Sequence, residues 1–177
     1  AAIKAIKILG IKSKITKNEV KIFGRGIEGY SYKKNVTIDA KNSGTLGRLI
    51  LGLLINTIYP IKLIGDNSLS RRDFRRVTKP LSKFGARFKL NKKKNLPLTI
   101  FGSQKLKSIK YVEKRGSAQC KSSVIFGGMR ADGITLIKAK KSRDHTELLC
   151  KYLNLPISIK RKKNYDEIKI QKIKSIQ

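Results

Sequence analysis

Acidic residues are scarce in this sequence: 11 Asp and Glu stand against 42 Lys and Arg among 177 residues, a formal net charge of +31. A basic surface can bind a nucleic-acid backbone by releasing counterions. A positive cleft can instead concentrate a small substrate that carries several negative charges. A third explanation is the lysine-rich bias expected of AT-rich coding. Lysines occur along nearly the whole chain, which excludes a single basic arm or tail.

Cysteine and histidine are almost absent, since the chain has only Cys120, Cys150 and His145. Their spacing does not suit a structural zinc ion, so we expect no metal site. Both cysteines lie in apolar contexts and are expected to be reduced core residues. Aromatic residues make up 7% of the chain and mostly fall within strand or helix patterns. This disfavours a protein that stacks nucleic-acid bases on an exposed surface.

Long apolar runs are also absent. No stretch of about 18 apolar residues occurs, so we predict no membrane span and no membrane partner. Lysines interrupt the first ten residues, which excludes a signal peptide, and we expect a cytoplasmic protein. Hydrophobic residues make up 40% of the chain, enough for one domain with a core. The sequence opens at Ala1 with the end of a helix, so we expect part of a longer protein.

What the sequence does contain is a repeat. Three segments share one pattern, in which a helix end is followed by a small turn residue, a strand, a polar turn and a second strand. A glycine or asparagine stands where each helix would end in a left-handed residue. The segments are residues 8–24, 83–102 and 152–171, with Gly10, Gly85 and Asn154 at the equivalent place.

The other half of the unit repeats as well. Ser43 and Ser117 each precede an apolar helix as its N-cap. A strand follows each helix, and second helices are expected to begin near Ser70 and Ser142. The two strands are expected at residues 61–64 and 134–137.

The repeating unit is therefore strand, helix, strand, helix and hairpin, or βαβαββ, of roughly 70 to 75 residues. We predict one α/β (α+β) domain over residues 1–177, with roughly parallel helices as its core and the sheets outside. Residues 1–35 would be the tail of one repeat, 36–106 the second repeat and 107–177 the third.

Polar clusters mark the expected helix starts, where free N–H groups and the helix dipole favour anions. Each cluster also fits an ordinary capped helix or a solvated basic helix face, and no paired carboxylates or catalytic triad are evident. The clusters are Asn42–Thr45, Ser70–Asp73, Ser117–Gln119 followed by Lys121 and Ser122, and Ser142–Glu147.

In order and spacing, these clusters resemble the motifs of the 5-enolpyruvylshikimate-3-phosphate synthases, which are enolpyruvyl transferases. The resemblance implies two similar domains of three βαβαββ units each, with this chain as most of the first. The family transfers the enolpyruvyl group of phosphoenolpyruvate to shikimate 3-phosphate and releases phosphate, and we expect no cofactor. The matching runs are NSGTLGRLILGLL (42–54), DNSLSRRDFRRVTKPLSKFGA (66–86), SAQCKSSVIFGGMRADG (117–133) and SRDHTELL (142–149).

The resemblance also implies roles for individual residues. Thr45 and His145 are further candidates, and His145 stands where some relatives have a tyrosine. Gly44 would contact the inhibitor glyphosate, a phosphoenolpyruvate mimic, which implies sensitivity in the intact enzyme. Phosphoenolpyruvate would be bound by Asn42, Gly44, Arg72 and Gln119, with Arg72 on its phosphate. Shikimate 3-phosphate would be bound by Ser117, Ala118, Gln119, Ser142 and Arg143.

The chain departs from the family pattern in what it lacks. The family's Lys-Ser…Arg segment would precede Ala1, and its acid–base residues and two further arginines belong to the second domain. We therefore assign no catalytic residue and expect little or no turnover from this chain alone. The expected partners are the two substrates and a second domain, in cis or as a partner chain, with no nucleic acid.

Three other classes compete with this interpretation. The enolpyruvyl transferases that act on UDP-N-acetylglucosamine share the fold but usually have a catalytic cysteine in a loop, whereas Cys120 adjoins a helix start. RNA 3′-phosphate cyclases share the repeat but use a histidine late in the chain. A basic nucleic-acid-binding protein is the alternative from another class.

Overall fold

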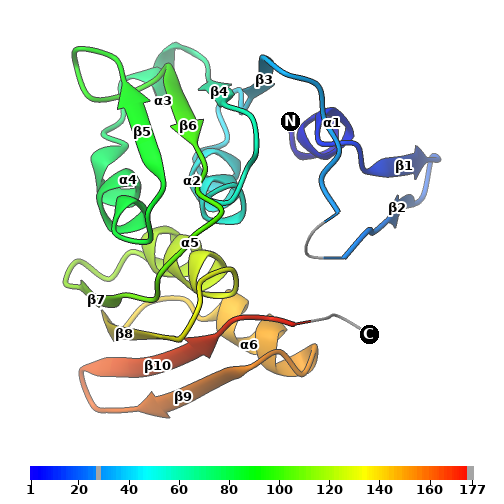
Figure 1. The fold of residues 1–177 in the computed structure, drawn as a ribbon. Coiled ribbons are helices and arrows are strands. Elements are labelled where there is room, and N and C mark those ends of the chain that lie inside the picture. The colour runs from blue at the N-terminus through cyan, green and yellow to red at the C-terminus, as the bar shows by residue number, and fades with distance from the viewer. Residues whose placement is uncertain (27–28, 175–177) are drawn as a thin grey trace.

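A computed structural model describes residues 1–26 and 29–174 of the chain (Figure 1). Residues 27–28 of the first predicted repeat and 175–177 of the third lie outside the described residues. In chain order the elements are α1 (Ala2–Ile8), β1 (Lys12–Ile15), β2 (Val20–Phe23), β3 (Val36–Asp39), α2 (Gly44–Leu53), β4 (Ile61–Ile64), α3 (Asn67–Ser70), α4 (Arg75–Ser82), β5 (Arg87–Leu90), β6 (Leu98–Phe101), β7 (Lys110–Glu113), α5 (Ala118–Gly128), β8 (Ile134–Lys140), α6 (His145–Tyr152), β9 (Ile157–Arg161) and β10 (Tyr165–Gln171).

Two four-stranded sheets have the same internal order, β3-β4-β6-β5 and β7-β8-β10-β9. In each sheet the first two strands are parallel, and the remaining neighbours are antiparallel. Parallel neighbours need a crossover connection, and α2 and α5 provide it. Each sheet with its helices is thus a βαβαββ unit, so the predicted fold class is confirmed.

The three predicted hairpins are also present. They pair β1 with β2, β5 with β6, and β9 with β10, all antiparallel. The residue that ends the preceding helix has a positive φ in each case: 82° at Gly10, 118° at Gly85 and 51° at Asn154. This left-handed conformation turns the chain out of the helix and into the first strand.

The core lies between the two sheets, where α2, α4 and α5 pack against one another (Figure 1). Apolar residues of α2 and α5 contribute to this core, with Ile50, Leu51, Val124 and Ile125 all buried. Cys120 and Cys150 are buried and unbonded, as predicted. None of the described helices has the length and apolar character needed to span a bilayer.

Gly52 allows α2 and α5 to approach each other closely. A Cβ atom at this position would overlap the backbone carbonyl oxygen of Ser123. One turn away, the Ser123 hydroxyl donates a hydrogen bond to the Arg48 carbonyl at 3.0 Å. The α2–α5 contact is therefore made by backbone atoms as well as side chains.

Replacing Gly52 with alanine should force these helices apart. We expect the free energy of unfolding to fall by about 2 kcal/mol, the usual size of an overpacking penalty. Urea unfolding followed by circular dichroism measures the loss. Gly24→Ala is the matched control, because a Cβ at Gly24 has open space around it. Equal stability of the two variants would show that the helix crossing tolerates a methyl group.

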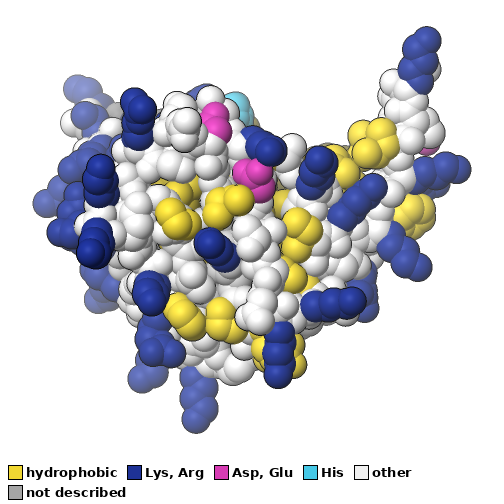
Figure 2. All heavy atoms as spheres, turned by 90° about the horizontal axis from the view of Figure 1, so that it is seen from above, with side chains coloured by type: hydrophobic (Ala, Val, Ile, Leu, Met, Phe, Trp, Pro, Cys, Tyr) yellow, Lys and Arg dark blue, Asp and Glu magenta, His cyan; other side chains and the backbone are white. Residues whose placement is uncertain are grey.

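The positive charge is spread over the molecule. Figure 2, which looks down on the molecule of Figure 1, shows Lys and Arg side chains all around this face, with few acidic side chains between them. A protein with a single nucleic-acid-binding stripe would gather its basic residues on one face or along one helix.

Candidate anion-binding site at the helix N-termini

Helices α2 and α5 begin in the same way. The Ser43 hydroxyl accepts a hydrogen bond from the Leu46 N–H at 3.1 Å, and the Ser117 hydroxyl accepts one from the Cys120 N–H at 3.3 Å. Both serines are the predicted N-caps, and each hydroxyl still has a proton to donate to a ligand. Buried Glu113 accepts a hydrogen bond from the Ser117 N–H at 2.9 Å, which fixes the backbone where α5 starts.

The prediction that a helix begins near Ser70 is wrong. Asp66 caps the short helix α3 by accepting a hydrogen bond from the Leu69 N–H at 2.8 Å, and α3 ends at Ser70. The next helix, α4, begins only at Arg75. Arg72 therefore lies in the turn between two helices, so its contribution to an anion site comes from its side chain.

A cavity of about 250 Å³ opens where the N-terminal ends of α2, α5 and α6 meet. Five of the predicted site residues line it, although they come from segments far apart in the sequence. Its lining residues are Thr45, Leu49, Ala118, Gln119, Ser122, Arg143, His145 and Thr146. We call this cavity the tip pocket.

Arg48 joins the tip pocket to the loop that carries Arg72. Its Nη1 donates to Gln119 Oε1 at 2.8 Å, and Gln119 Nε2 donates to Thr45 Oγ1 at 2.9 Å. A methyl group on Gly44 would lie 2.7 Å from Arg48 Nη1 and 2.9 Å from Arg72 Nη1. Two guanidinium groups thus flank Gly44, the first residue of α2.

The arginines of this region differ in their charge partners. Arg75 pairs with Asp73 at 2.7 Å, and Arg161 pairs with Asp166 at 3.5 Å. Arg72 and Arg143 are exposed and form no ion pair with any described residue. Planar guanidinium groups left without a carboxylate can bind phosphate or carboxylate in a bidentate manner.

The electrostatics of Arg48 also favour a negatively charged ligand in this region. Burial is the main cause that lowers the pKa of its guanidinium, and the nearby positive charges of Arg72 and Arg76 lower it further. Positive charges that repel one another become more favourable when an anion binds among them. The region around Arg48 is therefore suited to a negatively charged ligand.

The remaining predicted residues lie at the edge of the tip pocket. Ser117 and Ser142 directly precede lining residues, and the buried Ser142 hydroxyl has no hydrogen-bond partner among the described residues. Asn42 is exposed in the turn before α2. Three His, Cys, Asp or Glu side chains that could together hold a metal ion are not found among residues 1–26 and 29–174.

The sequence did not predict the role of Arg48 or the burial of Lys121. Arg48 follows Gly44 by four residues, so both lie on one face of α2, and this spacing was the available signal. Lys121 was grouped with the anion-binding candidates, but its ammonium is buried against Glu147, 2.6 Å away. Nothing in the sequence between them indicates that these two residues meet.

The fold and the site define a repeat α/β domain in which the N-terminal ends of three helices form a pocket lined by Gln119 and Arg143. The sequence model of the EPSP synthase (3-phosphoshikimate 1-carboxyvinyltransferase) family matches residues 1–175, and the chain belongs to that family. The predicted resemblance is thus confirmed.

Individual relatives agree with the family assignment. A 3-phosphoshikimate 1-carboxyvinyltransferase of Caldicellulosiruptor bescii is 42% identical over 154 residues, which are 86% of this chain and 35% of that protein. One of Clostridium tetani is 37% identical over 161 residues, 90% of this chain and 36% of that protein. The solved EPSP synthase of Acinetobacter baumannii superposes with a TM-score of 0.87 at 31% identity, covering 98% of this chain and 39% of that one. The chain thus spans little more than a third of the proteins it matches.

Proposed function

We propose that residues 1–177 are most of the first, substrate-binding domain of a 3-phosphoshikimate 1-carboxyvinyltransferase. In this proposal the domain binds shikimate 3-phosphate and phosphoenolpyruvate for the transfer of an enolpyruvyl group in aromatic amino-acid biosynthesis. The observation that carries the proposal is the tip pocket. There the ends of three helices converge, and the arginines beside them lack acidic partners among the described residues.

Shikimate 3-phosphate fits the ends of α5 and α6. Its phosphate would accept hydrogen bonds from the hydroxyls of Ser117 and Ser142 and from the Arg143 guanidinium. Gln119, which is already oriented by Arg48 and Thr45, would face the ring, beside Ala118 and His145. The unpartnered Ser142 hydroxyl supports this assignment, because a buried donor without a partner is costly until a ligand satisfies it.

Phosphoenolpyruvate fits the adjacent end of α2. Arg72 would hold its phosphate beside Gly44, where the missing side chain lets the guanidinium groups of Arg48 and Arg72 come close to the start of α2. Asn42 and Gln119 would complete this half of the site. The same geometry supports the prediction that glyphosate binds at Gly44 in the intact enzyme.

The proton-transfer groups and two further arginines would come from the second domain, in cis or as a partner chain. Positioned acid–base groups contribute a factor of about a hundred to ten thousand to such reactions. We therefore expect the chain by itself to bind ligand without turnover. An assay for phosphate release from phosphoenolpyruvate and shikimate 3-phosphate tests this, and turnover by the purified chain would contradict the division of the site.

Calorimetric titration tests the binding function. We expect saturable 1:1 binding of shikimate 3-phosphate. A single-stranded oligonucleotide, the ligand of the rival function, serves as the comparison at two salt concentrations. A nucleic-acid-binding protein would bind it tightly and lose roughly a thousandfold or more in affinity between low and moderate salt. The proposal would be refuted in favour of this rival if the chain bound the oligonucleotide tightly, lost that affinity strongly as the salt concentration rose, and did not bind shikimate 3-phosphate.

The UDP-N-acetylglucosamine enolpyruvyl transferases are not supported as an alternative. Their catalytic cysteine is expected in a loop, whereas Cys120 is the third residue of α5 and is buried. A thiol packed inside a helix bundle cannot reach a substrate in the tip pocket. The shikimate enzyme is therefore the better assignment within the enolpyruvyl transferases.

A further inference from the structure

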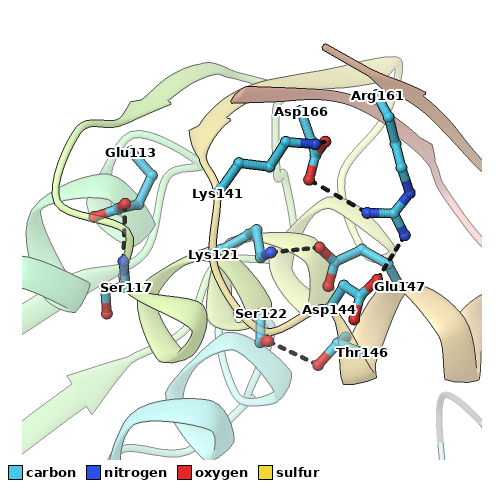
Figure 3. Close-up of polar contacts among 10 residues, drawn as sticks. All are labelled: Glu113, Ser117, Lys121, Ser122, Lys141, Asp144, Thr146, Glu147, Arg161 and Asp166. Carbon is cyan, nitrogen blue, oxygen red and sulfur yellow. Dashed lines mark hydrogen bonds and ion pairs between the residues drawn. The ribbon is translucent and has the colours of Figure 1, made fainter. Parts of the chain in front are cut away.

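Two adjoining contacts join α5 to α6 (Figure 3). The Lys121 ammonium lies 2.6 Å from Glu147 Oε1, and both side chains are only 1% exposed. The hydroxyls of Ser122 and Thr146 lie 2.7 Å apart. We call these four residues the α5–α6 clamp: consecutive residues of one helix hold consecutive residues of the other.

Lys121 and Glu147 of the clamp lie behind the two helix ends that face the tip pocket, whereas Ser122 and Thr146 also line it. Lys121 and Ser122 come one turn after Ser117 and Ala118, at the i+4 spacing that places residues on one helix face. Thr146 and Glu147 are in the first turn of α6, just after Arg143. Any change in the distance between α5 and α6 at the clamp would therefore change the distance between their ends.

Strands β9 and β10 also hold the N-terminal end of α6 in place. Arg161 on β9 contacts Asp144, the N-cap residue of α6, and lies 3.5 Å from Asp166 on β10 (Figure 3). Lys141 also pairs with Asp166, at 2.6 Å. The start of α6 is thus fixed on one side by the sheet and on the other side by the clamp.

We propose that Lys121 and Glu147 are positioning residues for shikimate 3-phosphate. They cannot touch the ligand, because both are buried. They instead set the separation of the α5 and α6 ends that grip its phosphate. This inference rests on the proposed function of the tip pocket and gives two residues that do not reach the substrate a role in its binding.

The chemistry of the pair supports a role beyond stability. Apolar residues of the same volume usually stabilise a core as well as a buried ion pair does, while the ion pair fixes one arrangement of its partners. Glu147 Oε2 has no hydrogen-bond partner among the described residues, so the pair is not part of a fully satisfied polar network. Among the described residues, the Lys121 ammonium and the Glu147 carboxylate have only each other as a partner, so each charge depends on the other to be compensated in the core, and the pair ties α5 to α6 at this point.

The paired variant Lys121→Met/Glu147→Leu tests the inference. It keeps the volume and the net charge of the site, and we expect its dissociation constant for shikimate 3-phosphate to rise about tenfold, since small misplacements of binding groups are costly. Lys121→Arg/Glu147→Asp keeps an ion pair of similar span and should restore most of the affinity. The control is Lys172→Met/Asp132→Asn, which removes an exposed ion pair near the C-terminal end of α5 and should leave the affinity unchanged.

The outcomes of these experiments test the positioning role of the clamp and the proposed substrate separately. Wild-type affinity in the paired variant would overturn the positioning role. If the paired variant does not fold, Glu147→Gln decides instead, because it keeps the volume of the buried side chain and an acceptor for Lys121 but removes the charge. It should weaken binding, and wild-type affinity of this variant would overturn the positioning role. A wild-type chain that binds inorganic phosphate but not shikimate 3-phosphate refutes the substrate, and the same affinity ratios measured with phosphate then test the clamp. Binding of neither would refute both.

Discussion

Replacing Arg72 with alanine is expected to weaken phosphoenolpyruvate binding by about 3 kcal/mol, or roughly a hundredfold. Arg72 is exposed, forms no ion pair with a described residue, and places Nη1 beside Gly44. Its charge has no carboxylate to neutralise it, so the free protein gains little from keeping this side chain. Isothermal titration of phosphoenolpyruvate against the chain measures the loss.

The controls for Arg72 come from the same position and from the start of the next helix. Arg75→Ala makes the same change in net charge three residues away, but Arg75 is already paired with Asp73, so we expect less than about a threefold effect on binding. Arg72→Lys should be intermediate, because lysine keeps the charge and loses the bidentate geometry. Shikimate 3-phosphate binding should change little in all three variants. Normal phosphoenolpyruvate binding by Arg72→Ala would refute the role of this residue.

The repeat was predictable because each unit combines several local signals. Gly10, Gly85 and Asn154 mark helix ends in a conformation that L residues seldom adopt. Alternating apolar residues follow each of them, as the two faces of a strand require, although the β1–β2 hairpin leaves Ile15, Val20 and Ile22 exposed. Ser43 and Ser117 then mark the helices that cross between parallel strands. Signals that agree at every level define a fold, which is why the order of strands and helices followed from the sequence.

The geometry of the site was harder to predict because it depends on residues far apart in the chain. Arg48 orients Gln119, 71 residues later, and no local pattern indicates such a pairing. The start of α4 was misplaced because Asp66 caps an earlier short helix, and Ser70 has the same residue type as a cap. The arginine-rich turn between the two helices reads as a helix start when only residue types are considered.

The Lys121–Glu147 pair gives the largest expected effect on stability. Glu147→Leu leaves the Lys121 ammonium buried without a counter-charge, and Lys121→Met leaves the Glu147 carboxylate in the same position. Each single variant should lose about 3–5 kcal/mol in free energy of unfolding, measured by urea unfolding. The paired variant should fall within about 1 kcal/mol of the wild type, because it removes both charges and keeps the volume.

The exposed pair of Lys172 and Asp132 is the matched comparison. Its side chains are 48% and 73% exposed, so Lys172→Met should cost less than about 1 kcal/mol. A double-mutant cycle on the buried pair should then give a coupling of several kcal/mol, whereas the exposed pair should give almost none. Single variants of Lys121 and Glu147 that are as stable as the wild type would mean that water or a rearranged side chain compensates the remaining charge. In that case the two helix ends are held by their other contacts, among them the Ser122–Thr146 hydrogen bond, and the separation of α5 and α6 does not depend on this pair.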